Sequence, residues 1–197
     1  MRIIALTGNI AAGKSTVARR LVARGAVLID ADAIVRALQQ PGTAVHAAIV
    51  ARFGADILHA DGTLDRPALR SLILADPAAR ADLEAIIHPE VERERQRLVA
   101  DAAAHGASVV IADIPLLFEA ADPSAYDGVI LVDAPAAVRR DRLVRDRGLD
   151  PDEADRLIAA QMPSSAKRSR ATWVLDNTGD RADLERATDR LWDRLTA

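Results

Sequence analysis

Residues 8–16 have the clearest chemical meaning in the chain, because they read G-N-I-A-A-G-K-S-T and match the pattern G-x-x-x-x-G-K-[ST]. They follow the apolar run Ile3–Leu6 and precede a helical stretch, which is the strand–loop–helix context of a phosphate-binding loop. Gly8 permits a tight departure from the strand, and Gly13 removes a Cβ where backbone approaches a phosphate. The amides of residues 9–15 gather at a helix N-terminus, whose dipole favours anions. The pattern predicts binding of a nucleoside triphosphate.

Side chains within this loop extend the prediction. Lys14 is expected to bridge the β- and γ-phosphates, and the Ser15 hydroxyl to hold Mg²⁺. Ala11 and Ala12 contribute mainly backbone, and Ala12 adds a methyl group near the phosphates. Of the 26 basic residues 24 are Arg, and the two lysines are Lys14 and Lys167. In a chain that uses Arg for almost every cation, a Lys indicates a place that needs a compact ammonium rather than a planar guanidinium. We apply this inference to Lys14.

The loop specifies the nucleotide but leaves the reaction open. A guanine-selective switch is expected to carry an Asn-Lys-x-Asp segment, and neither lysine stands in one. A motor or transporter ATPase usually needs a larger body than 197 residues. The small size favours a small-molecule kinase. A nucleoside or nucleotide kinase and a non-kinase nucleotide switch remain the alternatives.

The elements that must position the loop are expected from five short, nearly continuous apolar runs, as in strands covered on both faces. Helical patterns separate them, which predicts an α/β fold with a parallel sheet of five strands and helices on both faces. Four of the runs end in an acid, and ligands of such sheets gather at that edge. The runs are Ile3–Leu6, Ala26–Ile29, Val109–Ala112, Val129–Val132 and Trp173–Leu175, and the acids are Asp30, Asp113, Asp133 and Asp176.

The spacing of the runs is uneven and predicts a single domain with an insertion. Residues 1–30 and 108–197 are expected to form the core, and residues 31–107 a helical insertion. The insertion is expected to break at Pro41-Gly42, Asp61-Gly62, Pro67, Pro77 and Pro89. An Arg-rich helical segment over about residues 139–170 is the candidate lid, and an amphipathic helix is expected over residues 180–195.

Composition excludes several classes of protein. Half of the residues are apolar and 28% are charged, which is typical of a globular chain. The chain has no Cys, which removes disulfides, thiol nucleophiles and zinc-thiolate sites and is compatible with the cytoplasm. No apolar run approaches the ~18 residues that cross a bilayer. The net charge of −3 and 3% aromatic residues argue against nucleic-acid binding.

Further segments together resemble the dephospho-CoA kinase family over nearly the whole chain. The most specific of them are Asp30-Ala31-Asp32, His88-Pro89 and Pro115-Leu116-Leu117-Phe118-Glu119, and weaker matches are Phe53-Gly54, Asp61–Arg66, Arg142-Leu143, Ala160-Gln161 and Asp176–Gly179. The resemblance implies transfer of the ATP γ-phosphoryl group to the ribose 3′-hydroxyl of dephospho-CoA, giving coenzyme A and ADP in the last step of coenzyme A synthesis. It also implies a P-loop kinase fold of strand order 2-3-1-4-5, an acceptor-binding insertion, a lid, a cytoplasmic location and no obligatory protein partner.

The resemblance carries catalytic roles to Asp32, Lys14 and Arg142. Asp32 follows the second predicted strand and is expected to orient the 3′-hydroxyl, because phosphoryl transfer depends more on orientation than on a strong base. Arg142 is expected to neutralise charge on the triphosphate, together with either Arg145 or Arg147. For Arg139 and Arg140 we expect a solvated helix face instead.

The remaining candidate residues bind ATP or the acceptor. Arg36 shares a helix face with Asp32, and either pairs with it or binds the acceptor's phosphate. Asp113 supports the metal or the acceptor, or caps a loop, and Asn177 either touches adenine or caps a turn. The candidates for ATP are Gly8, Ala11, Ala12, Gly13, Lys14, Ser15 (also the metal), Thr16, Arg142 and Asn177, and those for dephospho-CoA are Thr7, Asp32, Arg36, His88 and Asp113.

Overall fold

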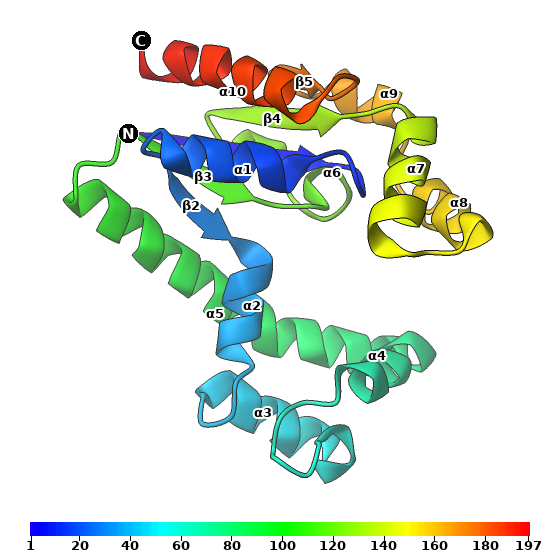
Figure 1. Ribbon diagram of the computed structural model, residues 1–197. Helices are drawn as coiled ribbons and strands as arrows, with labels where there is room; N and C mark the ends of the chain where they lie inside the picture. Colours follow the sequence, from blue (N-terminus) through cyan, green and yellow to red (C-terminus); the bar gives the residue numbers. More distant parts are fainter. The chain divides into compact units, whose positions relative to one another are not determined.

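A computed structural model describes residues 1–197, apart from the side chain of Ala120. The described residues form a five-stranded sheet of order β2-β3-β1-β4-β5 (Figure 1), which confirms the predicted order. The pairs β1–β3, β1–β4 and β4–β5 are parallel. The strands are β1 (Arg2–Gly8), β2 (Val27–Asp30), β3 (Val109–Asp113), β4 (Gly128–Asp133) and β5 (Trp173–Asp176).

Strand register determines which residues meet at the carboxyl edge of the sheet. Leu6 of β1 is in register with Asp113 of β3, and Gly8 with Val132 of β4. The middle strands β3 and β4 are buried along their whole length. Asp113 is therefore placed beside the point where β1 runs into the phosphate loop.

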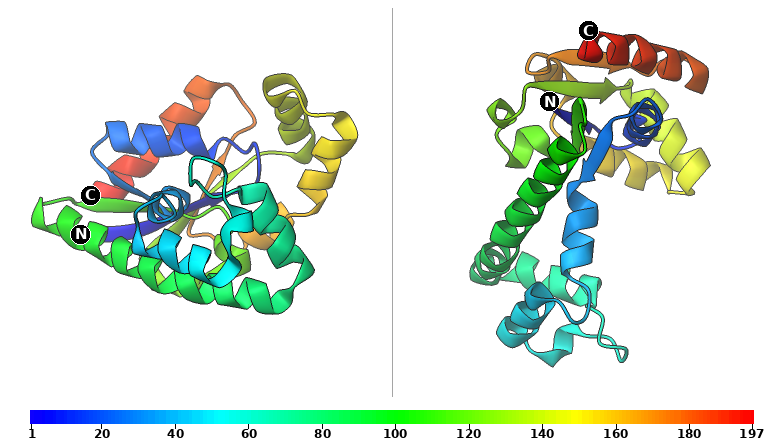
Figure 2. Two further views of the ribbon diagram at one scale, coloured as in Figure 1. Left: turned by 90° about the horizontal axis from the view of Figure 1, so that it is seen from below. Right: turned by 90° about the vertical axis from the view of Figure 1, so that its left-hand side faces the viewer.

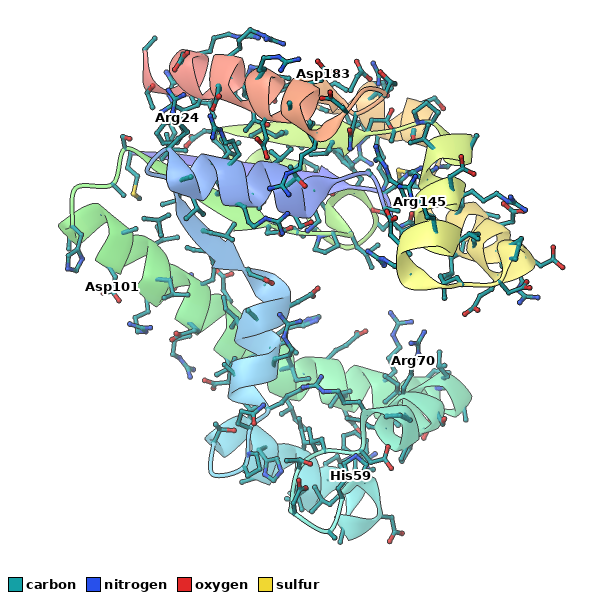
Figure 3. All side chains as sticks on the ribbon, in the orientation of Figure 1. Arg24, His59, Arg70, Asp101, Arg145 and Asp183 are labelled. Atoms are coloured by element: carbon teal, nitrogen blue, oxygen red, sulfur yellow. The ribbon has the colours of Figure 1, made fainter. Side chains whose placement is uncertain are left out.

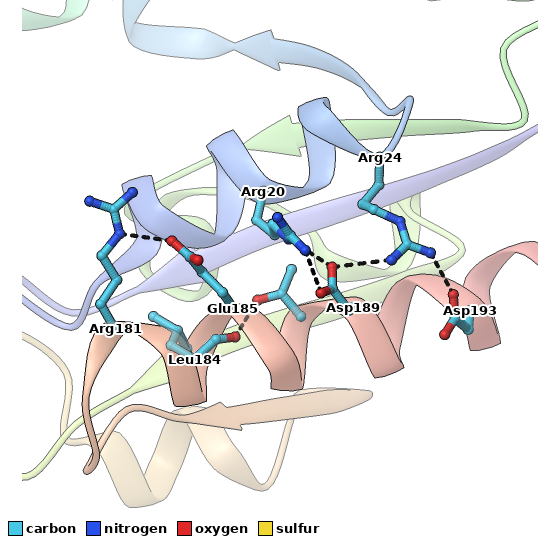
Figure 4. A network of polar contacts seen from close by, with 8 residues as sticks. Arg20, Arg24, Arg181, Leu184, Glu185, Asp189 and Asp193 are labelled. Atoms are coloured by element: carbon cyan, nitrogen blue, oxygen red, sulfur yellow. Dashed lines mark hydrogen bonds and ion pairs between the residues drawn. The ribbon is translucent and has the colours of Figure 1, made fainter.

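One face of the sheet is covered by α1 (Lys14–Ala23) and α10 (Arg181–Thr196), which pack side by side (Figure 4). Their apolar faces share a core that includes Val17, Leu21 and Leu191. Ion pairs lie along the outer seam, where Arg20 donates two hydrogen bonds to Asp189 at 2.6 and 2.7 Å. The expected amphipathic terminal helix is confirmed.

The opposite face carries shorter helices, which confirms helices on both faces. Leu117 and Phe118 of α6 (Leu117–Ala120) pack with Ala5 and Val129 of the sheet, and Met162 joins them beside α9 (Ser164–Arg168). Between these helices the chain forms a 3₁₀ turn, η2 (Pro123–Ala125), and the helices α7 (Ala136–Arg147) and α8 (Pro151–Ala159).

The chain forms two compact units, residues 1–29 with 102–197 and residues 30–101. The second unit has its own apolar core, which includes Ile49, Leu69 and Leu83. It contains α2 (Ala31–Leu38), α3 (Ala44–Phe53), η1 (Ala55–Ile57), α4 (Arg66–Ala75) and most of α5 (Pro77–Ala104). We expected an insertion over residues 31–107, because no strand pattern falls between Asp30 and Ser108. The second unit ends within α5, and a helix that continues from one unit into the next carries no mark of that boundary in its sequence.

Two local expectations were wrong. Pro89 does not end a helix but lies inside α5, which Figure 2 shows as one continuous helix. Ile86, Ile87 and Val91 around it pack into the core of the second unit, which offsets the lost hydrogen bond and the steric clash of an interior proline. Strand β2 is not covered on both faces, because it is an edge strand whose Val27 and Leu28 are exposed.

None of the described helices is long and apolar enough to cross a membrane.

Leu191 joins α10 to the sheet and tests this packing. Its side chain is 1% exposed, so Leu191→Ala is expected to lower the free energy of unfolding by about 2–5 kcal/mol through lost burial and a cavity. Urea unfolding followed by circular dichroism measures the change. A loss below about 1 kcal/mol would contradict the placement of α10 in the core.

Candidate functional site

The phosphate loop is fixed by close contacts at both of its glycines. A Cβ on Gly8 would lie 2.6 Å from the carbonyl oxygen of Val132. Gly13 has φ of +102°, and a Cβ there would lie 2.3 Å from Nδ2 of Asn177. The two glycines are therefore required by neighbouring protein atoms, and not only by the approach of a phosphate as expected from the sequence.

Several backbone amides of the loop have no acceptor. Among the described residues, the N–H groups of Ala11, Gly13, Lys14 and Ser15 find no backbone or side-chain partner. Gly13, Lys14 and Ser15 lie at the N-terminus of α1, where unpaired donors and the helix dipole attract an anion. Ala11 contributes its amide from a left-handed conformation, with φ of 58°. The cluster is smaller than the expected range of residues 9–15.

Two other amides of the loop are already used. The N–H of Ala12 donates to the carbonyl of Asn9 at 3.0 Å, and the N–H of Ile10 donates to Oε1 of Gln161 at 2.8 Å. The methyl group of Ala12 is 1% exposed and belongs to the apolar core. The expectation that this methyl lies near the phosphates was therefore wrong.

The carbonyls of the loop are held by side chains from the C-terminal half of the chain. Arg142 of α7 donates to the carbonyl of Ala11 at 3.1 Å and to that of Asn177 at 3.3 Å. The buried Asn177 donates from Nδ2 to the carbonyl of Ala12 at 2.8 Å. Arg142 and Asn177, both candidates for ATP binding, thus lie at the loop, and Asn177 anchors the loop by this hydrogen bond.

The start of the loop has a further anchor that sequence analysis missed. Asn9 is 5% exposed, and its Nδ2 donates to the carbonyl of Met162 at 3.3 Å and to Oγ of Ser164 at 3.2 Å. Together with Gln161, these residues form a segment, 161–164, that lies against the loop. The Ala160-Gln161 match to the family was the one available signal, and it said nothing of this contact.

Lys14 forms an ion pair with Asp113 through Nζ and Oδ1. The two side chains keep 20% and 11% of their surface exposed, so this pair is screened less than one on the surface. The register of β1 and β3 brings the acid here, as the position of Asp113 at a strand end predicts. The Lys14 ammonium is thus paired with the Asp113 carboxylate, and the negative charge of a bound polyphosphate can take the place of that carboxylate.

A cavity of about 380 Å³ adjoins the loop, and its lining includes three arginines and two aspartates. It is lined by Gly13, Thr16, Arg142, Arg145, Asp146, Asn177, Gly179, Asp180, Arg181 and Leu184. Arg145 lies on α7 (Figure 3) and donates to Asp146 at 2.7 and 3.2 Å. These hydrogen bonds raise the pKa of Arg145 and lower that of Asp146. Arg147 does not line the cavity.

The prediction for Arg139 was wrong, because its side chain is buried. It is 5% exposed, its Nε donates to the carbonyl of Ala134 at 3.1 Å, and burial lowers its pKa. Arg140 instead pairs with Asp155. Two of the acids expected at the site, Asp133 and Asp176, are paired with Arg168.

The predicted acceptor residues fall in different places. Thr7 is buried in β1 and donates from Oγ1 to the carbonyl of Pro115 at 3.2 Å. Asp32 in the first turn of α2 and His88 in α5 are exposed side chains of the second unit. Arg36 does not pair with Asp32, because its ion-pair partner is Asp30 at 3.7 Å. Asp30 in turn caps α2 by accepting from the N–H of Ala33.

Comparison with known proteins shows the family to which this chain is related. The family model for dephospho-CoA kinase matches residues 2–183. The chain belongs to the dephospho-CoA kinase family. A dephospho-CoA kinase of Anaeromyxobacter dehalogenans is 47% identical over 97% of this chain and 90% of the relative, and one of Corynebacterium diphtheriae is 44% identical over 99% and 98%. The resemblance noted in the sequence is thereby confirmed.

Solved structures share the fold of this chain. The crystal structure of TT1252 from Thermus thermophilus has a TM-score of 0.82 and 39% identity over 100% of this chain and 98% of its own. Dephospho-CoA kinase from Campylobacter jejuni has a TM-score of 0.70 at 23% identity, over 98% and 96% of the two chains. A shikimate kinase from Bacteroides thetaiotaomicron, with a TM-score of 0.52 at 17% identity over 100% and 99%, shares the fold. The fold is therefore that of P-loop kinases, as predicted.

The contact at Gly13 yields a test with a matched control. Gly13→Ala and Gly148→Ala both place a Cβ at positive φ, which costs about 1–2 kcal/mol, but nothing lies within 4 Å of a Cβ on Gly148. Gly13→Ala also displaces Asn177 from Ala12, so its loss in unfolding free energy is expected to exceed that of the control by about 1–3 kcal/mol. Equal losses in denaturant unfolding would show that Asn177 does not hold the loop.

Proposed function

We propose that this chain phosphorylates the ribose 3′-hydroxyl of dephospho-CoA with ATP, giving coenzyme A and ADP, the last step of coenzyme A synthesis. The observation that carries the proposal is the cluster of unpaired amides at Ala11, Gly13, Lys14 and Ser15, in a chain of the dephospho-CoA kinase family. Unpaired donors at a helix N-terminus are suited to a polyphosphate. Family membership supports ATP as the donor and dephospho-CoA as the acceptor.

The phosphates of ATP bind to these amides, and Lys14 bridges the β- and γ-phosphates. In the structure Lys14 is paired with Asp113, so binding exchanges one anionic partner of the ammonium for another. Because little covalent chemistry is required of the protein, fixed donors around the developing charge carry most of the catalysis. Arg142 adds a second positive charge at the same loop.

Mg²⁺ fits the residues present at the loop. It usually keeps several waters and binds through phosphates and one or two protein groups, and the described residues contain no cluster of three or more acids or histidines that would form a protein cage. The exposed Ser15 hydroxyl is the proposed direct ligand, and Asp113 an acid that supports it. When bound, the ion neutralises charge on the β- and γ-phosphate oxygens.

The nucleoside of ATP binds in the cavity of about 380 Å³ beside the loop. Gly13 and Thr16 form its loop side, and Arg142 and Asn177 lie between the cavity and the loop carbonyls. Arg145 lines the cavity and Arg147 does not, so we assign the second lid arginine to Arg145. The lid over about residues 139–170 closes over the phosphates and excludes water.

The second unit binds the acceptor in this proposal. Asp32 accepts a hydrogen bond from the 3′-hydroxyl and aims its oxygen at the γ-phosphorus, since an exposed carboxylate is a free acceptor. The proton passes to Asp32 late in the transfer. Arg36 and His88 of the second unit bind other parts of the acceptor, and Thr7 and Asp113 of the first unit are the remaining candidates for acceptor binding. The enzyme acts in the cytoplasm on a small molecule and needs no obligatory protein partner.

Asp32→Asn tests the assignment of the base. The variant keeps the shape of the side chain but binds the hydroxyl less well and takes no proton, so kcat for dephospho-CoA is expected to fall by about 10²–10⁴. ATP affinity is expected to stay within about twofold, because Asp32 belongs to the second unit and the phosphate loop to the first. Coupled ADP release measures the first quantity and equilibrium titration the second. Near-normal turnover would refute the role of Asp32.

Lys14→Met is expected to give the complementary pattern. It removes the ammonium and leaves Asp113 without this partner, so ATP binding and turnover should both fall, by a combined factor of at least about 10² in kcat/KM for ATP. The same coupled assay gives both constants. Unchanged kcat/KM would exclude Lys14 from phosphate binding.

Product identity separates the proposal from its alternatives. ADP release is followed with dephospho-CoA, nucleosides and nucleoside monophosphates, and mass spectrometry checks each product for one added phosphate. The proposal predicts phosphorylation of dephospho-CoA with a kcat/KM at least ~100-fold above that of the other acceptors. Preference for a nucleoside or a monophosphate would assign another kinase activity, and slow hydrolysis that no acceptor stimulates would assign a switch.

A further inference from the structure

The second lysine of the chain, in α9, is fully buried. Lys167 has an exposed fraction of 0%. Among the described residues, the acidic group within 4 Å of its Nζ is Glu119 of α6, whose Oε1 lies 2.7 Å away. No described group accepts from Nζ with hydrogen-bond geometry, so the contact is a charge pair. Because a buried ammonium is costly unless it is paired, the burial of Lys167 depends on Glu119.

The Lys167–Glu119 pair joins two segments that each lead to the phosphate loop. The segment from Asp113 to Glu119 begins with the ion-pair partner of Lys14 and ends with that of Lys167. Lys167 lies in the helix that follows residues 161–164, the segment that contacts the start of the loop. A second contact reinforces the junction, since Arg170 lies 4.7 Å from the Phe118 ring centroid and donates to the Phe118 carbonyl at 3.3 Å.

The loop depends on residues 161–164 for two of its own contacts. The N–H of Ile10 donates to Gln161, and the side chain of Asn9 donates to Met162 and Ser164. Asn9 and Ile10 directly precede Ala11, whose unpaired amide belongs to the phosphate-binding cluster. The direction of that amide therefore depends on where residues 161–164 lie.

The presence of Lys rather than Arg at position 167 indicates that this junction requires a compact cation. Arg supplies 24 of the 26 cations in this chain, yet Lys stands at 167. A guanidinium has five N–H donors and a wide planar head, and at full burial beside one carboxylate it would leave donors unpaired. The compact ammonium fits this junction.

We propose that Lys167 is a positioning residue, which through Glu119 holds residues 161–164 against the phosphate loop and thereby sets the affinity for nucleotide. This rests on the proposed function in one respect, that the loop binds ATP. Loss of the charge pair releases α9 from α6, and Asn9 and Ile10 lose their partners. The effect falls on nucleotide binding, because the residues proposed to bind the acceptor in the second unit are untouched.

Lys167→Met, which keeps length and removes the charge, tests the proposal. Binding of a fluorescent ADP analogue is expected to weaken about 10-fold, with a matching rise in KM for ATP, while KM for dephospho-CoA changes less than about twofold. Arg24→Met is the matched control, because it removes ion pairs with Asp189 and Asp193 at the far end of α1. Its ADP affinity is expected to equal that of the wild type.

A double-mutant cycle separates positioning from simple stability. Gln161→Ala removes the acceptor of the Ile10 amide, and in the Lys167→Met background it is expected to weaken ADP binding by less than about twofold more, because both changes act through one contact. Two outcomes overturn the proposal: a lowered Tm with ADP affinity unchanged, or effects of the two changes that multiply.

The double variant Lys167→Met/Glu119→Gln decides the question if Lys167→Met does not fold. It neutralises both partners, so no buried charge is left without its counter-charge, and the same loss of ADP affinity and the same non-additivity with Gln161→Ala are expected. Failure of the proposed function is distinct from failure here. A wild type that does not phosphorylate dephospho-CoA would refute the first, whereas ADP affinities that do not respond to residues 119 and 167 would refute the second.

Discussion

Backbone donors that have no acceptor are tolerated in a folded chain only where water or a ligand reaches them. The N–H groups of Ala11, Gly13, Lys14 and Ser15 are such donors, and much of the surrounding structure serves to hold them in place. Arg142 and Asn177 bind the carbonyls of the same turn, so those oxygens do not fold back onto the amides. With the carbonyls occupied, the open donors present a site for an anion.

The anchors of this N-terminal loop come from the C-terminal half of the chain, which explains why that half is needed to hold it. Strand order places β1 between β3 and β4, so Asp113 and the segments after β4 and β5 all reach the loop. The terminal helix α10 packs against α1 and fixes the helix whose N-terminus carries three of the donors. Nucleotide binding is thus a property of the whole first unit.

Local sequence patterns predicted the strands well, but they did not predict contacts between residues that lie far apart in the sequence. The strands and the phosphate loop could be recognised in the sequence, because an apolar run or a glycine spacing is visible within a few consecutive residues. The contacts of Asn9 and Gln161 were missed, since an amide side chain that binds a distant backbone leaves no periodic signal. Arg139 was misjudged for the same reason, because its burial depends on how α7 packs after β4. Pro89 was read as a break, although core packing around it keeps α5 continuous.

The most direct test follows the amides themselves in a ¹H–¹⁵N correlation spectrum during titration with ADP and Mg²⁺. Hydrogen bonds donated to a phosphate should shift the resonances of Ala11, Gly13, Lys14 and Ser15 most, and those of Ile10 and Ala12 least, since the latter two already have acceptors. If nucleotide binds while those four resonances stay in place, the turn is not the phosphate site and the account fails.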